Sequence, residues 1–244
     1  MARCSTKLRI RCCLALLTAV PLWGQLESLM LGERLVYRAG FRLLAAGETV
    51  METSARVSAE GDTLLHVTAR TRTDPFFDAL YPIDDHIQLW LEPGSGALRR
   101  MVRDINEGRF HRRDSSWVDG AQMVLYARGD TLQLAGPIFD PIGAIYHLRS
   151  LDLVVGDTIR LTIFDGRRLR PIAVRVSGPV MKASPAGTFE CLALLPASLD
   201  ERQLTKAGDL LRLWVSNDAR RLPVRIEQRA SFGLLVLRLL SVSP

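Results

Sequence analysis

The chain has 244 residues, of which 48% are hydrophobic, and this composition excludes a disordered or low-complexity protein. Its formal net charge of +6 comes largely from the first 24 residues, which carry four of the 32 basic residues and no acid. The other 28 basic and 26 acidic residues are interspersed, which argues against a nucleic-acid-binding stripe and against nucleic acid as a partner.

Residues 1–24 have the pattern of a secretory signal peptide. A positive region precedes a short apolar region, residues 12–23, and Gly24-Gln25 is the expected cleavage site. A retained membrane anchor is the alternative, although a spanning helix needs about 20 apolar residues. We therefore predict a periplasmic or extracellular protein with no membrane span after cleavage, and a single β-rich domain over residues 25–244. The basic residues of the positive region are Arg3, Lys7, Arg9 and Arg11.

Cleavage removes three of the four cysteines and leaves Cys191. An intramolecular disulfide is then impossible, so core packing alone must hold the fold, and a chain of this length is long enough to supply it. Cys191 lies in a strand-like apolar run, residues 189–195, which favours a buried structural thiol over a nucleophile.

From Glu33 to Leu134 the pattern is that of successive strands. Apolar and polar residues alternate, and Gly- and Asp-containing turn signals recur about every 8 to 14 residues, as in an antiparallel meander. A short helical excursion from Thr73 to Tyr81 interrupts the meander and carries an aromatic cluster of Phe76, Phe77 and Tyr81. The predicted strands are 33–41, 47–57, 63–71, 84–92, 97–106, 109–118, 122–127 and 131–134.

The segment from Gly136 to Gly166 changes the pattern from strand to helix and back. Asp140 is a good N-cap and Pro141 suits the first helical position, so a helix is predicted from here to about Leu151. A strand from Thr158 to Phe164, an Asp-Gly turn and a return strand from Leu169 to Val176 follow. Apolar residues recur at helical spacing in this helix, at Ile142, Ile145, Tyr146 and Leu148.

The rest of the chain again has strand patterning. Strands are predicted at 179–183, 188–195, 210–215, 222–228 and 232–240, with a polar loop or irregular helix at 197–207 and a bulge at Gly233. The fold class is thus mainly β. About 14 strands should form one curved antiparallel meander sheet, a barrel or half-barrel, since an open sheet of this length exposes its edges. Two short helices are expected to cap its concave side.

Several motifs occur in a fixed order: D-P-I-G-A-I-Y-H-L-R from Asp140, G-D-T-I-R-L from Gly156, S-P-A-G-T-F-E-C from Ser184 and L-W-V-S-N-D-A-R-R-L-P-V-R-I-E from Leu213. In this order they resemble the bacterial family called domain of unknown function 3108, over about Gly32 to Leu240. The resemblance implies an exported β-rich protein and brings no reaction and no catalytic residues. The last motif is also similar to a hairpin of the half-barrel lipid carriers of the periplasm.

The chain contains no recognised catalytic or metal-binding motif. G-x-S-x-G, H-E-x-x-H, a phosphate loop and G-x-G-x-x-G are all absent. Asp84-Asp85-His86 could supply metal ligands, but neighbouring strand residues point to opposite faces and cannot converge on one ion without a bulge. His66 is expected on a polar or solvent face, His111 on a basic face and His147 on the helix surface. We designate no catalytic, metal-binding or ligand-binding residue and no cofactor.

The function predicted from the sequence is therefore that of a non-catalytic exported envelope protein. We expect it to bind an apolar or amphipathic ligand, such as a lipid, or an envelope protein, in the concavity of the curved sheet. An enzyme acting on envelope polymers and a structural partner in an envelope assembly are the alternatives. The basic strand region Arg99–Arg113, near Phe110 and Trp117, is a further candidate surface for anionic lipid head groups or glycan, against the default of a screened, mixed-charge face.

Overall fold

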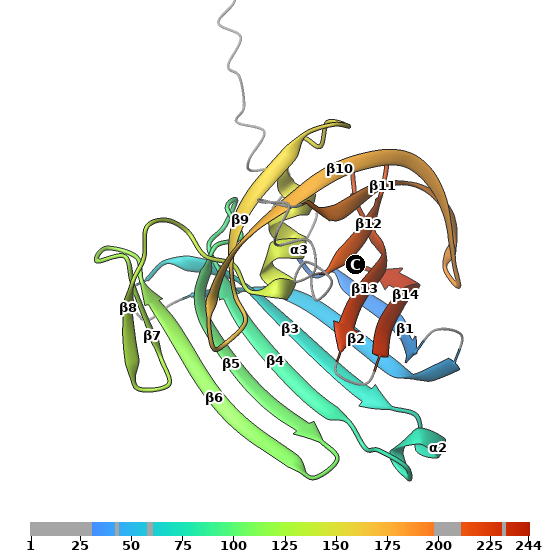
Figure 1. The fold of residues 1–244 in the computed structure, drawn as a ribbon, viewed down its shortest axis with the longest axis horizontal. Helices are drawn as coiled ribbons and strands as arrows, with labels where there is room; N and C mark the ends of the chain where they lie inside the picture. Colours follow the sequence, from blue (N-terminus) through green and yellow to red (C-terminus); the bar gives the residue numbers. More distant parts are fainter. Residues whose placement is uncertain (1–30, 42–43, 58–60, 198–210, 231–232) are drawn as a thin grey trace, which may run out of the picture.

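The computed structural model describes residues 31–41, 44–57, 61–197, 211–230 and 233–244, which form one fourteen-stranded sheet and two helices (Figure 1). This confirms the predicted fold class. The strands are β1 Arg34–Phe41, β2 Leu44–Val57, β3 Thr63–Thr73, β4 Asp84–Leu91, β5 Leu98–Glu107, β6 Phe110–Asp119, β7 Val124–Ala127, β8 Asp130–Gln133, β9 Thr158–Phe164, β10 Leu169–Ser184, β11 Gly187–Ala197, β12 Arg212–Ser216, β13 Pro223–Ala230 and β14 Gly233–Ser243; the helices are α2 Pro75–Asp78 and α3 Pro141–Ser150.

The sheet is a meander in which the first and last strands of the chain lie side by side, whereas two strands from the middle of the chain form its free edges. The strand order runs from β8 back to β1, then from β14 back to β9, and every pair is antiparallel. The first and last strands therefore pair with each other, with Arg34 opposite Ser243 and Phe41 opposite Leu235. The two free edges are β8 and β9, and the segment between them contains α3.

Helix α3 lies on the concave side, between the two halves of the curved sheet (Figure 1). The residues before it connect these halves: the amide of Leu98 on β5 donates to the carbonyl of Ile138, and Phe139 exchanges backbone hydrogen bonds with β9. The segment that breaks the strand pattern in the sequence thus fills the gap in the sheet. Its structure saturates backbone groups that an open edge would leave unpaired.

Local sequence chemistry sets the start of α3. The Asp140 carboxylate accepts hydrogen bonds from the amides of Ile142 and Gly143, and Pro141 occupies the first turn. Burial raises the pKa of Asp140 to about 6, although these two amides and the Arg103 charge act in the opposite direction. The cap predicted from the Asp-Pro pair is confirmed.

Opposite sides of α3 pack against different halves of the sheet. Ala144, Ile145 and Leu148 belong to one buried cluster with residues of β1, β2 and β9–β14. Tyr146 belongs to a second cluster with residues of β3, β4, β5 and β7. Helix α3 thus contributes residues to both cores, and their apolar burial, at about 25 cal/mol per Å², stabilises its position between them.

Arg103 on β5 connects the half of the sheet that contains β5 to the β9–β10 turn of the other half through hydrogen bonds. Its guanidinium binds both carboxylate oxygens of Asp114, at 2.9 and 3.0 Å, and donates to the carbonyls of Asp165 at 2.7 Å and Gly166 at 3.4 Å. The predicted Asp-Gly turn is present, with Gly166 at a φ of +85°. Arg103 therefore supports the curvature across the open side.

Three predicted boundaries differ from the structure. Strand β10 runs on to Ser184 through a register shift between Ser177 and Val180, so the separate strand predicted at 179–183 is its second half. Gly233 begins β14 opposite Ala230 and is not a bulge; the irregularity of β14 lies opposite Val36 and Tyr37. The first turn, predicted at 45–47, falls earlier because β2 already begins at Leu44.

The loop or irregular helix predicted at 197–207 lies, apart from Ala197, outside the described residues, as does the signal peptide predicted at 1–24. In the part of the chain that is described, neither helix has the length and the apolar character needed to cross a membrane.

Candidate functional site

A cavity of about 620 Å³ opens at the C-terminal end of α3. We call it the helix-end cavity. Four parts of the chain meet there: the end of α3, the adjoining ends of β2 and β3, the β4–β5 turn and the β12–β13 turn. Its volume lies in the range of small-molecule sites, about 300–1,000 Å³. The lining residues are Leu31, Ala55, Thr63, Leu64, Leu65, Glu92, Pro93, Gly94, Gly96, Tyr146, Arg149, Ser150, Leu151, Asp152, Ala219 and Arg221.

The wall of the cavity is mostly apolar. Leu64 and Leu65 come from the start of β3, and Leu151 from the end of α3. Leu31, at the edge, is 44% exposed. An apolar surface at an opening costs free energy in water, so a hydrocarbon group that covers it is bound favourably.

The floor of the cavity contains a buried ion pair. The Arg149 guanidinium donates to both oxygens of Glu33, each at 2.7 Å, and to the carbonyl of Arg220 at 3.2 Å. Their side chains are 1% and 8% exposed. Burial lowers the pKa of Arg149, but the hydrogen bonds and charge of Glu33 raise it by more, so Arg149 remains charged. The pair joins α3 to the residue before β1 and to the β12–β13 turn.

Beside this pair lie polar atoms with no hydrogen-bond partner in the described structure. They are the hydroxyls of Tyr37 and Tyr146 and the Nε of Arg149. The Arg149 guanidinium lies 5.4 Å from the centre of the Tyr146 ring. Burial raises the pKa values of Tyr37 and Tyr146, so both hydroxyls keep their protons. Since buried donors are normally satisfied, their number beside one cavity is unusual.

Two of these three donors belong to residues that line the cavity, Tyr146 and Arg149. A tyrosine hydroxyl and a guanidinium Nε both donate hydrogen bonds. Both donor atoms are buried behind the cavity lining, so only a hydrogen-bond acceptor that enters between the lining side chains can reach them. The ion pair is neutral as a whole, so it does not require a charged ligand.

The β4–β5 turn is held against α3 by a close backbone approach. The His147 imidazole donates from Nδ1 to the carbonyl of Ser95, and its ring packs 4.4 Å from the Phe139 ring centre. Gly96 has a φ of +68°, and a Cβ there would lie 3.2 Å from the backbone of His147. Burial lowers the pKa of His147, against the raising effect of Ser95. His147 is thus half-buried and holds the rim of the cavity in place.

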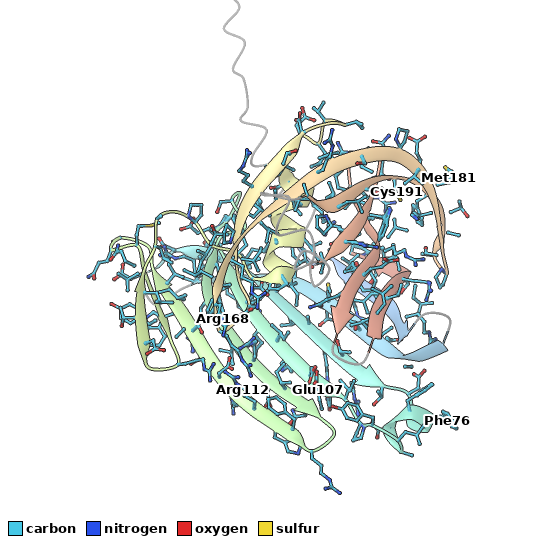
Figure 2. All side chains as sticks on the ribbon, viewed as in Figure 1. Phe76, Glu107, Arg112, Arg168, Met181 and Cys191 are labelled. Atoms are coloured by element: carbon cyan, nitrogen blue, oxygen red, sulfur yellow. The ribbon has the colours of Figure 1, made fainter. Side chains whose placement is uncertain are left out.

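The aromatic cluster at 76–81 does not face the concavity. Helix α2 has four residues and buries none of them, and Phe76 is 73% exposed. Phe76 lies with α2 at the far end of the β3–β4 pair, away from α3 (Figure 2). The expectation that both helices cap the concave side is therefore wrong for α2 and holds for α3. Of the apolar residues predicted at helical spacing in α3, Ile145, Tyr146 and Leu148 are buried and Ile142 is half-buried.

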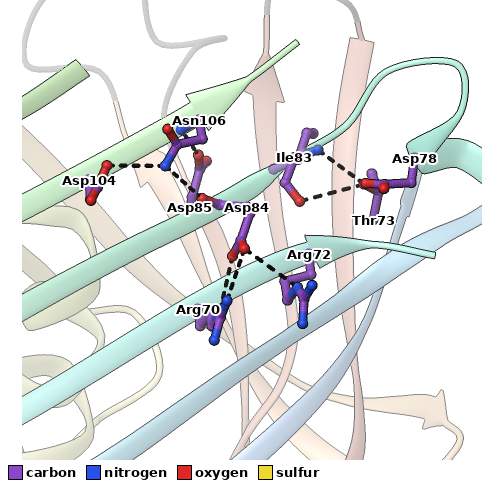
Figure 3. Close-up of polar contacts among 9 residues, drawn as sticks. All are labelled: Arg70, Arg72, Thr73, Asp78, Ile83, Asp84, Asp85, Asp104 and Asn106. Carbon is purple, nitrogen blue, oxygen red and sulfur yellow. Dashed lines mark hydrogen bonds and ion pairs between the residues drawn. The ribbon is translucent and has the colours of Figure 1, made fainter. Parts of the chain in front are cut away.

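Asp84 and Asp85 contact different partners (Figure 3), and with His86 they do not form one site. Asp84 makes two 2.9 Å hydrogen bonds to Arg70, whereas Asp85 accepts from the amide of Asn106 at 2.8 Å. Burial, together with Glu107, raises the pKa of Asp85 to about 6, against the lowering effect of the Asn106 amide. Across the described residues, no three His, Cys, Asp or Glu side chains lie close enough to hold one metal ion.

The other residues considered in the sequence, His66, His111 and Cys191, have surroundings typical of structural residues. His66 is 7% exposed and stacks 4.7 Å from Trp90, so it is more buried than predicted, and burial lowers its pKa. His111 is exposed and bonds to Asn106 at 2.9 Å. Cys191 is fully buried, which raises the pKa of its thiol to about 11, as expected for a structural cysteine. It lies on β11 (Figure 2) and is not among the residues that line the helix-end cavity.

Sequence reasoning missed Glu33, Tyr37 and Arg149. Each is an ordinary strand or helix residue in the sequence, and 116 positions separate Glu33 from Arg149. The only local indication was Arg149 itself, a charged residue in a helix whose neighbours Tyr146 and Leu148 are apolar. Charges are rarely fully buried unless they are paired, so such a residue invites a search for an acid.

The fold and cavity together define a class: an open, barrel-like antiparallel meander with a helix between its two halves. A crystal structure of a beta-barrel-like protein of domain of unknown function DUF1849 from Brucella abortus shares this fold, with a TM-score of 0.56 and 13% identity over 88% of this chain and 98% of that one. The chain itself belongs to the family described as protein of unknown function (DUF3108), which matches residues 36–239.

A DUF1089 family protein from Pseudomonas aeruginosa has a TM-score of 0.41 and 14% identity, over 71% of this chain and 87% of that one. No curated protein matches the sequence. The family resemblance predicted from the ordered motifs is confirmed.

Proposed function

We propose that this protein is a non-catalytic factor of the bacterial envelope that binds one amphipathic molecule in the helix-end cavity. The observation that carries the proposal is the pairing of an apolar wall with unpartnered donors on Tyr146 and Arg149. The ligand is a molecule with one hydrocarbon chain and a head that accepts hydrogen bonds, such as an ester, amide or carboxyl group. Location in the envelope is supported by the signal-like residues 1–24.

The absence of a catalytic role is part of this proposal. A general acid or base must be free to exchange a proton near neutral pH. Around the cavity, Glu33 and Arg149 bind each other, and the raised pKa values of the two tyrosines keep them protonated. These groups suit recognition of a polar head better than chemistry on it.

The first experiment is native mass spectrometry of the protein purified from its own envelope without detergent exchange. The expected result is a bound amphipathic molecule at a ratio of one per chain. The delipidated protein is then titrated with dansyl-labelled undecanoic acid, whose fluorescence rises in an apolar site. A protein that carries no lipid and does not bind the probe would overturn the proposal.

Three variants locate the binding. Tyr146→Phe removes one unpartnered hydroxyl and is expected to weaken probe binding by about 1 kcal/mol, roughly fivefold, while leaving the stability unchanged or higher. Leu65→Gln makes the wall polar and should weaken it further. The control is Tyr126→Phe on β7, which does not line the cavity. Equal effects of the Tyr126 and Tyr146 substitutions would place the ligand elsewhere, and conversion of the probe to a product would refute the non-catalytic part.

A further inference from the structure

A row of aromatic and cationic side chains crosses the outer face of the sheet. The register places Trp90, Arg100, Trp117 and Tyr126 directly opposite one another on β4, β5, β6 and β7. Directly opposite residues lie on the same face. Their neighbours Leu89, Met101 and Ser116 are buried on the other, concave face. This row therefore lies on the side of the sheet away from α3.

The rings of this row contact one another but remain accessible. Tyr126 stacks against Trp117 with ring centres 5.0 Å apart and planes inclined by 11°. Trp117 is nevertheless 50% exposed. The Arg100 guanidinium lies 5.1 Å from the Trp90 ring centre, which is on the side away from Trp117. One side of the Trp117 indole is thus left without an aromatic or guanidinium partner among the described residues.

A groove of about 730 Å³ runs beside this row, across β5 to β8. We call it the outer groove. Trp117 and Tyr126 line it, and smaller residues two positions along the strands, Val102 and Ser115, are opposite each other and also line it. Two large aromatic side chains next to small ones produce a step in the surface against which a flat ring can rest. The groove is separate from the helix-end cavity, with which it shares no residue.

The outer groove has an excess of positive charge. The exposed guanidinium groups of Arg100, Arg113 and Arg128 have no carboxylate within ion-pair distance in the described structure. Of the two carboxylates in the lining, Asp114 is bound by Arg103 at 2.9 Å and Arg112 at 2.7 Å. Asp130 is the other. The groove therefore complements a ligand with more than one negative charge.

We propose that the outer groove binds an acidic oligosaccharide. The negative face of an indole attracts the weakly positive C–H groups of a sugar ring, which accounts for the exposed Trp117. Guanidinium groups bind carboxylates and sulfates with paired hydrogen bonds, which accounts for the unpaired arginines. Ser115, Asp130 and Thr131 offer donors and acceptors for sugar hydroxyls.

The surroundings of the groove favour a saccharide over a membrane surface. A membrane-binding face needs large apolar side chains that enter the lipid. Here, the residues around Trp117 and Tyr126 are polar or charged, including Arg113, Ser115 and Thr131. The basic region Arg99–Arg113 noted in the sequence therefore falls into two groups. Arg103 and Arg112 pair with Asp114. Arg100 and Arg113 line the outer groove.

The test is a calorimetric titration of the purified protein with hexagalacturonate, with maltohexaose as a neutral probe of equal length. We expect binding of the acidic probe, a change in tryptophan fluorescence, and at least about tenfold weaker binding of the neutral one. Trp117→Ala and Arg100→Gln should each weaken hexagalacturonate binding about tenfold. Arg100→Gln should also reduce the preference for the acidic probe.

Phe110→Ala is the matched control. Phe110 lies on the same strand as Trp117 and is 48% exposed, but its register position is on the opposite face. Its substitution should leave binding unchanged, and melting curves will show that all three variants fold. No binding, equal binding of both probes, or equal weakening by Phe110→Ala would overturn the proposal. So would binding to phosphatidylglycerol vesicles that Trp117→Ala abolishes, if hexagalacturonate binding persists in that variant.

Discussion

Helices α2 and α3 begin with the same Asp-Pro pair and carry similar apolar residues, yet they differ in capping and in burial. In α3, Asp140 caps two amides and six of the ten residues are buried. In α2, Asp74 makes no cap hydrogen bond, its carboxylate lies 3.4 Å from Arg38, and no residue is buried. The two helices thus share the Asp-Pro pair in sequence but not the cap hydrogen bonds, and we attribute this difference to what surrounds each helix.

The surroundings differ because α3 connects the two free edges of the sheet, whereas α2 lies within a connection between adjacent strands. A segment that joins β8 to β9 must pass between the two halves and can bury both of its sides. A segment that joins β3 to β4 needs only to reverse direction. This contrast predicts that substitutions in α3 cost far more stability than matched substitutions around α2.

The largest effect is expected for Arg149→Met. Removing the guanidinium leaves the Glu33 carboxylate buried without its partner, which costs about 3–5 kcal/mol of unfolding free energy. The matched substitution is Arg38→Met, which removes the half-exposed partner of Asp74 and should cost less than about 1 kcal/mol. Guanidinium unfolding curves measure both. Similar losses in the two variants would contradict the comparison.

A smaller effect is expected for Ile145→Ala. Ile145 is 2% exposed in the core between α3 and the sheet, and its truncation leaves a cavity that costs about 2–5 kcal/mol. Phe76→Ala in α2 removes a larger side chain that is 73% exposed and should change stability by less than about 0.5 kcal/mol. The same unfolding curves provide the measurement. If Phe76→Ala proved the more costly, α2 would have to pack against something in solution.

The helix caps should differ by less. Asp140→Ala removes the acceptor for Ile142 and Gly143 and should cost about 1–2 kcal/mol. Asp74→Ala loses no cap hydrogen bond and is expected to be nearly neutral. Thermal melts of both variants at pH 7 compare the two directly. Equal shifts of Tm would show that the two Asp-Pro motifs contribute equally after all.

The last prediction concerns the pH dependence of stability. The pKa of Asp140 is raised in the folded protein to about 6, above its ordinary value of 3.8, so the folded state binds a proton more tightly than the unfolded state. The contribution of Asp140 to stability is thus largest below pH 4 and falls as the pH rises through 6. Asp140→Asn keeps a capping oxygen without this titration. The variant should gain up to about 3 kcal/mol over wild type as the pH rises from 4 to 7, because each unit of pKa difference corresponds to about 1.4 kcal/mol.

Unfolding curves of the two proteins at matched pH values test this prediction. The raised pKa of Asp85 affects both proteins equally and cancels in the difference. A difference that does not change with pH would show that Asp140 does not titrate in this range.

The local features of the fold were predictable from the sequence. Period-two alternation with frequent turn residues predicts the meander, because each strand has one buried and one wet face. Asp140-Pro141 predicts the start of α3 through backbone groups only a few residues away. The continuous β10 was missed because Gly178-Pro179 has the composition of a turn, whereas in the structure it produces a register shift within one strand.

The candidate site was not predictable in the same way. Glu33 and Arg149 become neighbours only because β1 pairs with β14 and because α3 enters the concave side. Likewise, the row of Trp90, Arg100, Trp117 and Tyr126 depends on the register of four strands, and a shift of one residue would turn any of these side chains to the other face. Neither arrangement has a signature within a single segment.

The sequence by itself determined the strand-rich fold class and the family to which the chain belongs. The tertiary structure decided which of two similar Asp-Pro helices is buried, where the helix-end cavity opens and which arginines remain unpaired. The physical reason is one of range and magnitude. Capping and turn preferences act over a few residues and contribute about 1 kcal/mol each, whereas burial and charge pairing in α3 contribute several and depend on strands more than a hundred residues away.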